Sequence, residues 1–211
     1  MTSRVRKRLT AEARRAKILS AAVRAFAVDG YDNTSMDRIA ALAGVTKPVV
    51  YDYFPSKQAL FRTVLEAIRD GLLAKGKLVA EASKDPEEKF RRAVDVFLQF
   101  VEREPDAARV LLMVPRGDPV AAKLSRKVQA GASAGIASLL VLSMPGSAPW
   151  RVQAAAAFLK EGLHAVAEWW LEHSGAKRAD LVDIVTQLVW RGLQTPAPQP
   201  NVAIATRPSE V

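Results

Sequence analysis

Apolar residues recur every three or four positions along most of the chain, the spacing that places them on one face of an α-helix. The first such segment covers about residues 10–30, where Ile18, Ala22 and Ala25 share a face. Gly30 is suited to end this helix, because glycine readily adopts the left-handed backbone found just beyond helix C-termini. The pattern therefore predicts a first helix that braces whatever follows it.

Two short helices joined by a sharp turn are predicted between residues 34 and 55. Thr34 is suited to N-cap the first of them, and Gly44 supplies a left-handed turn after it. Thr46 can cap the second helix, and Pro48 is tolerated in its first turn, where N–H groups have no intrahelical partner. Together with the first helix, this pattern predicts a helix-turn-helix unit.

Six further helices are predicted in the remainder of the chain. They begin near Ser56, Pro86, Pro105, Pro119, Ser147 and Ala179. No strand-period pattern appears, so the predicted fold is all-α with about nine helices. We expect a helix-turn-helix DNA-binding domain over residues 10–55 and a helical effector-binding and dimerisation domain over 56–194. Residues 1–9 are predicted to form a flexible basic arm, and the proline-containing residues 195–211 a disordered tail.

The positive charge is concentrated near the N-terminus. The net charge of the 211 residues is +9, and the first 63 residues contain 12 Lys/Arg against 5 Asp/Glu. The rest contains 19 against 17. A basic helix-turn-helix segment of this kind is typical of DNA binding. The basic arm, with Arg4, Arg6, Lys7 and Arg8, either reaches along DNA or acts as a solubilising tail.

The amino-acid composition limits the cellular location of the protein and the chemistry that its side chains can perform. The chain has no cysteine, which excludes disulfides and zinc fingers and suits the reducing cytoplasm, where we expect the protein. No secretory signal is visible at the N-terminus. The longest uncharged stretch, residues 128–150, contains serines, prolines and glycines and does not predict a membrane span. We therefore expect no membrane partner.

The outward-facing residues of the two short helices have the chemistry that duplex DNA requires. Lys47 can neutralise a phosphate or donate to a guanine edge. Tyr51 and Tyr53 offer hydroxyls on stiff rings, and Lys57 follows Ser56 where free helix N–H groups also favour an anion. An ordinary helical hairpin with a solvated basic face is the alternative. The expected DNA-binding residues are Thr34, Ser35, Thr46, Lys47, Pro48, Tyr51, Tyr53 and Lys57.

This stretch resembles the tetracycline-repressor (TetR) family of bacterial transcriptional regulators, most strongly from Lys17 to Leu65. The resemblance rests on Gly30-Tyr31, on the turn containing Ala40, Gly44 and Val45, and on the run from Tyr51 to Lys57. It implies that the positions of Thr46, Lys47, Pro48, Tyr51, Tyr53 and Lys57 contact DNA. Asp52 departs from the pattern, because phosphate repels an acid on that face, although it could accept from a cytosine amine.

The last two helices carry more apolar surface than contact with one core requires. They are predicted to pair with the same helices of a second copy, which gives a homodimer with a four-helix interface. The two helix-turn-helix domains would then bind the two halves of a palindromic DNA site. The alternative is burial within one subunit. The expected dimer contacts are Leu159, Val166, Trp170, Val182, Val189 and Trp190.

The middle helices are predicted to enclose an effector, as the family resemblance also implies. The expected ligand-binding residues are Phe97, Val101, Leu112, Met113, Phe158 and Trp169, although the alternative is that all six are core. The effector would be small and apolar or amphipathic, for example of acyl type. Nearby cations either hold an anionic ligand or form a solvated face; they are Arg109, Arg116, Lys123, Arg126 and Lys127.

These features predict a ligand-responsive DNA-binding transcriptional regulator, a homodimeric repressor released from a palindromic operator by its effector. The alternative is a non-specific DNA-binding or adapter protein without an effector. An enzyme is not expected, because His164 has Glu161 and Glu168 one turn away but no third metal ligand. No GxSxG, P-loop or dinucleotide fingerprint is present. We therefore expect no catalytic residue, no metal and no cofactor.

Overall fold

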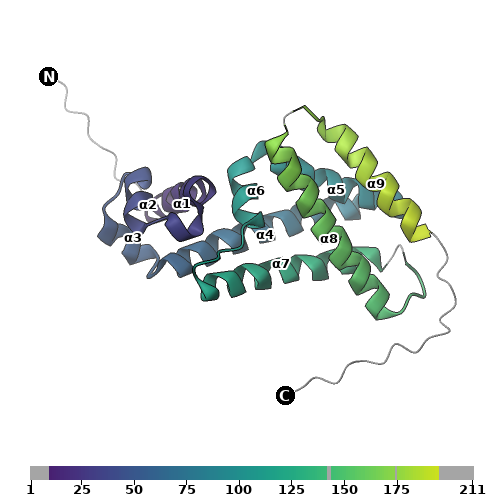
Figure 1. Ribbon diagram of the computed structural model, residues 1–211, viewed down its shortest axis with the longest axis horizontal. Helices are drawn as coiled ribbons and strands as arrows, with labels where there is room; N and C mark the ends of the chain where they lie inside the picture. Colours follow the sequence, from purple (N-terminus) through teal and green to yellow (C-terminus); the bar gives the residue numbers. More distant parts are fainter. Residues whose placement is uncertain (1–9, 142–143, 174, 195–211) are drawn as a thin grey trace, which may run out of the picture.

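The computed structural model describes residues 10–141, 144–173 and 175–194, and the predicted basic arm and tail lie outside these ranges. The described residues form nine α-helices and no strand, which confirms the all-α prediction. The helices are α1 (Ala11–Asn33), α2 (Met36–Ala43), α3 (Lys47–Tyr53), α4 (Lys57–Glu81), α5 (Pro86–Arg103), α6 (Pro105–Leu112), α7 (Pro119–Leu140), α8 (Pro149–Glu172) and α9 (Arg178–Gln194). In Figure 1, α1–α3 form a head at one end of the long axis, and α8 and α9 lie toward the other.

Local capping chemistry places the helices of the head. Ser35, and not Thr34 as predicted, N-caps α2 by accepting a hydrogen bond from the Arg38 amide at 3.1 Å. Gly44 ends α2 in the left-handed conformation, with φ +61° and ψ 39°. Gly30 does turn the chain, with φ +74°, but a further helical turn follows it before α1 ends at Asn33. The sharp α2–α3 turn therefore follows from one glycine in the left-handed conformation.

The core of the head extends into the rest of the molecule. Phe26, Tyr31 and Phe61 form an aromatic cluster, with ring centroids 4.7 to 5.7 Å apart. The same buried cluster includes Val110 from α6 and Val128 from α7. The head is thus packed on α4, α6 and α7, and the predicted domain bounds of 10–55 and 56–194 stay a prediction.

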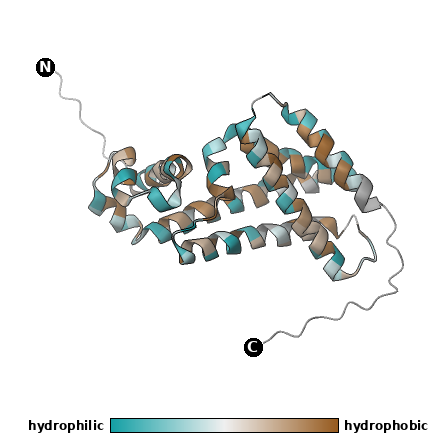
Figure 2. Cartoon of the chain, viewed as in Figure 1, coloured by the Kyte–Doolittle hydropathy of each residue, from teal (hydrophilic) through white to brown (hydrophobic). Residues whose placement is uncertain are grey.

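The remaining helices, α4–α9, form the part that we call the body. It contains a second buried cluster, formed by α5, α7, α8 and α9. Helix α9 packs along α5, and α8 packs on α7. Figure 2 shows hydrophobic residues distributed along these helices, including α8 and α9. Within the described ranges, each helix is too short or too polar to cross a bilayer.

Candidate nucleic-acid interface and effector cavity

Helix α3 presents one exposed polar side and one buried side. Val50 is fully buried and anchors α3 on the head. Thr46, Lys47, Pro48 and Tyr51 are exposed, and Thr46 makes no side-chain capping bond although it occupies the N-cap. The hydroxyl of Thr46 and the free N–H groups of the first turn are thus available to an anion. The arrangement can place a helix N-terminus and a lysine against a nucleic-acid backbone.

Lys47 pairs with Asp37 of α2 across the turn. Its Nζ lies 2.8 Å from Asp37 Oδ2, and the hydrogen bond that Lys47 donates to this carboxylate raises the pKa of Lys47. Both side chains are largely exposed, so the pair contributes little to stability in water. A phosphate can therefore replace Asp37 as the partner of Lys47 at small cost. Ser35 is also exposed at the start of α2, and Tyr53 is half-buried.

Two predicted DNA-binding residues are turned into the protein. Thr34 is only 2% exposed, and its hydroxyl donates to the carbonyls of Gly30 (2.6 Å) and Ala25 (3.2 Å). Lys57 donates from Nζ to the carbonyls of Tyr31 (2.9 Å), Asp32 (3.3 Å) and Thr34 (3.0 Å). Its ammonium also lies 4.4 Å from the centroid of the Tyr31 ring. Thr34 and Lys57 therefore hold the end of α1, and we expect neither side chain to contact DNA.

Replacing Lys57 by methionine is expected to destabilise the fold by about 2 kcal/mol, because three carbonyls lose a charged donor. Lys47→Met is the matched control, since that lysine is exposed, and it should change stability by less than about 0.5 kcal/mol. Urea unfolding measures both variants. In DNA binding the order of the two effects should reverse. Lys47→Met should flatten the salt dependence by about one ion for each head, and Lys57→Met should leave it unchanged. Wild-type stability of the Lys57→Met variant would contradict this structural role.

Two cations missed by the sequence analysis flank α3. The guanidinium of Arg15 lies 5.3 Å from the centroid of the Phe54 ring, directly after α3. Lys17 Nζ lies beside Gly44, 3.4 Å from where a β-carbon would be. Both are exposed and belong to the first turns of α1. Their only signal in the sequence is the basic composition of that segment, which does not reveal that α1 begins next to the α2–α3 turn.

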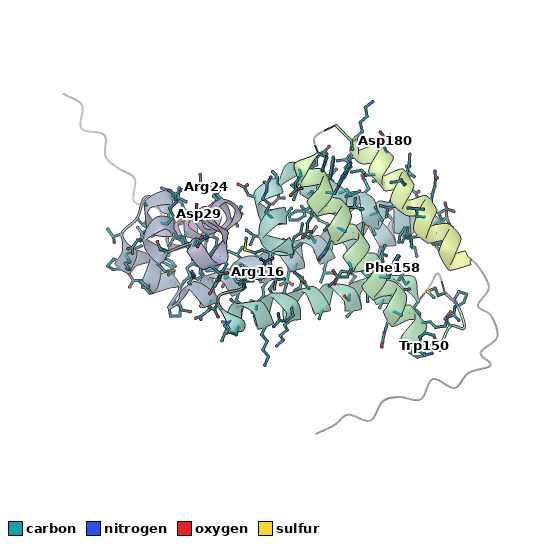
Figure 3. All side chains as sticks on the ribbon, viewed as in Figure 1. Arg24, Asp29, Arg116, Trp150, Phe158 and Asp180 are labelled. Carbon is teal, nitrogen blue, oxygen red and sulfur yellow. The ribbon has the colours of Figure 1, made fainter. Side chains whose placement is uncertain are left out.

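A pair of carboxylates joins the head to the α6–α7 loop; we call this set of contacts the junction clasp. Asp118 Oδ2 accepts from the Tyr31 hydroxyl (2.8 Å) and from Gln58 Nε2 (2.9 Å). Asp32 Oδ2 accepts in turn from the loop amides of Arg116 (3.0 Å) and Gly117 (3.1 Å). Arg116, labelled in Figure 3, marks this junction. Asp118 extends from the loop to the head, and Asp32 extends from the head to the loop. The clasp therefore fixes the head against the body.

Acid is expected to open the junction clasp. Backbone N–H donors lower the pKa of both Asp32 and Asp118, so their carboxylates are favoured in the folded chain. This stability is present above the unfolded pKa of about 3.9 and is lost as the pH falls through the lower folded values. We expect the melting temperature to fall more steeply below about pH 4 in the wild type than in an Asp32→Asn/Asp118→Asn double variant. Parallel curves would contradict the clasp.

The body contains a cavity of about 510 Å³ bounded by residues of α4 to α8. Its wall is mainly apolar and includes Leu72, Phe97 and Leu163. Of the predicted ligand-binding residues only Phe97 lines it. Val101 is buried in a neighbouring cluster. Leu112 and Met113 line a separate cavity of about 260 Å³ together with Arg109.

On α8 and α9, the residues that face outward are not the ones that the sequence predicted. Phe158 (75% exposed) and Trp169 point to solvent, so their predicted role in the effector cavity is wrong. Leu159 lines the cavity instead, while Val182 and Trp190 are buried in the chain's own core. These three cannot form the predicted dimer contacts. Figure 3 shows Phe158 on α8 and Trp150 near its start.

The remaining predicted dimer residues, Val166, Trp170 and Val189, are half-buried and stay a prediction. The predicted cavity cations also change. Within the described ranges, only Arg109 of that set lines either cavity. The cations along the larger cavity are Arg69, Lys77, Lys89 and Lys160.

Comparison with known proteins finds a protein family whose sequence model matches the head. Residues 18–64 match the sequence model of the bacterial regulatory proteins of the tetR family. The HTH-type transcriptional activator FasR of Mycolicibacterium smegmatis is 36% identical over 104 residues, which are 49% of this chain and 48% of that protein. The chain thus spans about half the length of the curated relatives that it matches.

Solved structures extend the likeness to the body. A TetR-like transcriptional regulator from Rhodococcus sp. RHA1 superposes with a TM-score of 0.74 at 27% identity, covering 90% of this chain and all of that one. The transcriptional regulator FadR from Bacillus subtilis in complex with stearoyl-CoA gives 0.75 at 16% identity over 84% and 98% of the two chains. The second likeness concerns the fold alone.

Proposed function

We propose that this chain, a member of the tetR family of bacterial regulatory proteins, is a homodimeric repressor that a small effector releases from a palindromic operator in the cytoplasm. That it is a DNA-binding transcriptional regulator follows from the family. The observation that carries the proposal is the exposed face of α3, with Thr46, Lys47 and Tyr51 beside the N-terminus of the helix.

In the proposed complex, α3 enters the major groove. The N–H groups of its first turn and the Thr46 hydroxyl contact phosphate, and Lys47 exchanges Asp37 for a phosphate or a guanine edge. Tyr51 lies one turn further along the same exposed side. Arg15 and Lys17 extend the positive surface to the flanking backbone. Base contacts then specify the sequence, while the phosphate contacts set the register.

An apolar stripe on α8 and α9 supports the homodimer. Phe158, Gly162, Ala165 and Trp169 are exposed at spacings of four, three and four residues, which place them on one side of α8. Ile184 and Leu188 form the corresponding exposed pair on α9. We call these six residues the outer stripe. Its small residues allow close approach of a second copy, and a four-helix interface would bury its aromatic and aliphatic side chains.

The cavity and the junction clasp supply a route for regulation. Leu111 of α6 lines the cavity, and its carbonyl accepts from Gln129 of α7. The loop between these helices carries Asp118 of the clasp. An effector that fits better when α6 and α7 are displaced would thereby reorient the heads and weaken operator binding. The stearoyl-CoA in the Bacillus subtilis FadR structure favours an apolar or amphipathic effector.

Selection of DNA by the purified protein tests this function. Sheared DNA from the source genome would be retained by the protein, sequenced, and assayed for transcription with and without protein. We expect an inverted repeat whose half-sites lie about one helical turn apart, and less transcript when protein is added. Retention of DNA without a shared sequence would favour the non-specific alternative, and more transcript would favour activation, the role named for FasR.

A further inference from the structure

A buried cation lies on the wall of the larger cavity. Lys160 of α8 is only 8% exposed although it is charged, and it lines the cavity together with Leu159 and Leu163. Its Nζ lies 2.6 Å from Oε1 of Glu161, whose side chain is largely exposed. Burying a charge is costly unless it is paired and hydrogen-bonded. Glu161 supplies such a pair for Lys160, but from a side chain that is itself largely exposed.

The ammonium of Lys160 has unused hydrogen-bonding capacity. An ammonium carries three donors. Among the residues that the structure describes, Glu161 is the partner recorded for it. Within the described ranges, no protein partner is recorded for the other two donors. An anion inside the cavity would satisfy them, and it would do so where water competes less than at the surface.

His164 adds a second polar group one helical turn from Lys160. It also lines the cavity, and its ring stacks on Phe97 with centroids 6.1 Å apart. Burial and the nearby Lys160 ammonium lower the pKa of His164, so its imidazole is neutral at pH 7. A neutral imidazole can donate one hydrogen bond to a ligand oxygen without adding a further charge.

The other basic residues on the cavity wall differ from Lys160. Lys77 is 78% exposed at its side chain and lies 3.9 Å from Glu81. Arg69 pairs with its neighbour Asp70 at 2.8 Å. Both therefore have a carboxylate beside them. Lys89, the fourth cation along the cavity, is half-buried. Of these four cations only Lys160 is buried, and beside Leu159 and Leu163 it gives the cavity an anion-binding end.

We infer that the cavity binds a single-chain aliphatic carboxylate, with its head on Lys160 and His164 and its tail among the apolar side chains of α4, α5 and α7. The volume of about 510 Å³ lies in the usual range of ligand pockets, roughly 300–1,000 Å³. Two free donors match the two oxygens of one carboxylate. The inference deepens the proposed function by naming the effector class, and it rests on that function only for the regulatory consequence.

Binding of dodecanoate and dodecanol by calorimetry, each below its micelle concentration, tests the inference. The wild type should bind dodecanoate at least about tenfold more tightly than dodecanol, because a charged hydrogen bond is lost with the alcohol. Lys160→Met should lower dodecanoate affinity by about tenfold or more and leave dodecanol binding unchanged. The control Lys77→Met removes an exposed lysine of the same cavity and should change both affinities by less than about twofold.

Glu161→Gln provides a second variant at an exposed position. It removes the carboxylate that competes for Lys160, so dodecanoate should bind more tightly and dodecanol as before. Equal wild-type affinity for acid and alcohol would overturn the inference, as would an unchanged preference in Lys160→Met. Binding of dodecanoyl-CoA without binding of dodecanoate would also overturn it, because the head would then lie elsewhere. Operator binding by the ligand-free protein, measured in parallel, tests the proposed function separately.

Discussion

Leu188→Glu is expected to convert the dimer to monomers and to weaken specific DNA binding by about a hundredfold or more. Leu188 is 72% exposed in the single chain and lies one turn from Ile184 on α9. In the proposed dimer both residues are buried against a second copy with Phe158 and Trp169. A carboxylate there would be buried without a partner, and the twofold axis would place two such charges in one interface.

Leu78→Glu is the matched control for this prediction. Leu78 is 67% exposed on α4, so the substitution is the same but it lies outside the outer stripe. Analytical ultracentrifugation should show dimers for the wild type and for Leu78→Glu, and monomers for Leu188→Glu. DNA affinity should fall only in the monomeric variant, because one head alone makes about half of the contacts. A dimeric Leu188→Glu protein would exclude this surface as the interface.

Lys47→Glu is expected to have the second large effect, a loss of DNA binding of about a hundredfold or more while the fold is kept. Each of the two heads would exchange a phosphate attraction for a repulsion, and the new carboxylate would lie beside Asp37. Because Lys47 and Asp37 are exposed, we expect the melting temperature to change little.

Lys84→Glu separates the local effect of Lys47→Glu from a change in net charge. Lys84 is exposed just before α5, in the body and away from the head, and its substitution alters the net charge by the same amount. We expect Lys84→Glu to keep nearly all of the wild-type affinity at 0.15 M salt, where charges beyond about 8 Å are screened. Fluorescence anisotropy with a labelled duplex measures all three proteins. An equal loss in the two variants would contradict a direct contact by Lys47.

The head was predictable because its signals are local. A glycine at position 44, a residue of capping type before each short helix and a buried Val50 are read within a few residues of one another. The errors arose where a tertiary contact decides. Thr34 and Ser35 are both good capping residues, and only the packing of α1 shows that Thr34 bonds to Ala25 and Gly30. The acceptors of Lys57 lie 23 to 26 residues earlier in the chain.

The body was less predictable because α8 has apolar residues on several sides. Phe158 and Leu159 are adjacent, and periodicity cannot say which of them faces inward. The contacts with α5 and α7 settle this, with Leu159 inside and Phe158 outside. The position of Lys160 could not be predicted from the sequence either. A lysine beside a glutamate usually indicates a solvated face, and only the folded chain places this one against an apolar cavity.

The most direct test of the central claim is the binding of purified protein to its selected duplex in the presence of competing random DNA. The mass of the complex is measured at the same time by light scattering. We predict two chains, or a multiple of two, on each inverted repeat, with a preference over random DNA of at least about a thousandfold. Equal affinity for both DNAs, or no binding to any duplex at low ionic strength, would contradict the account.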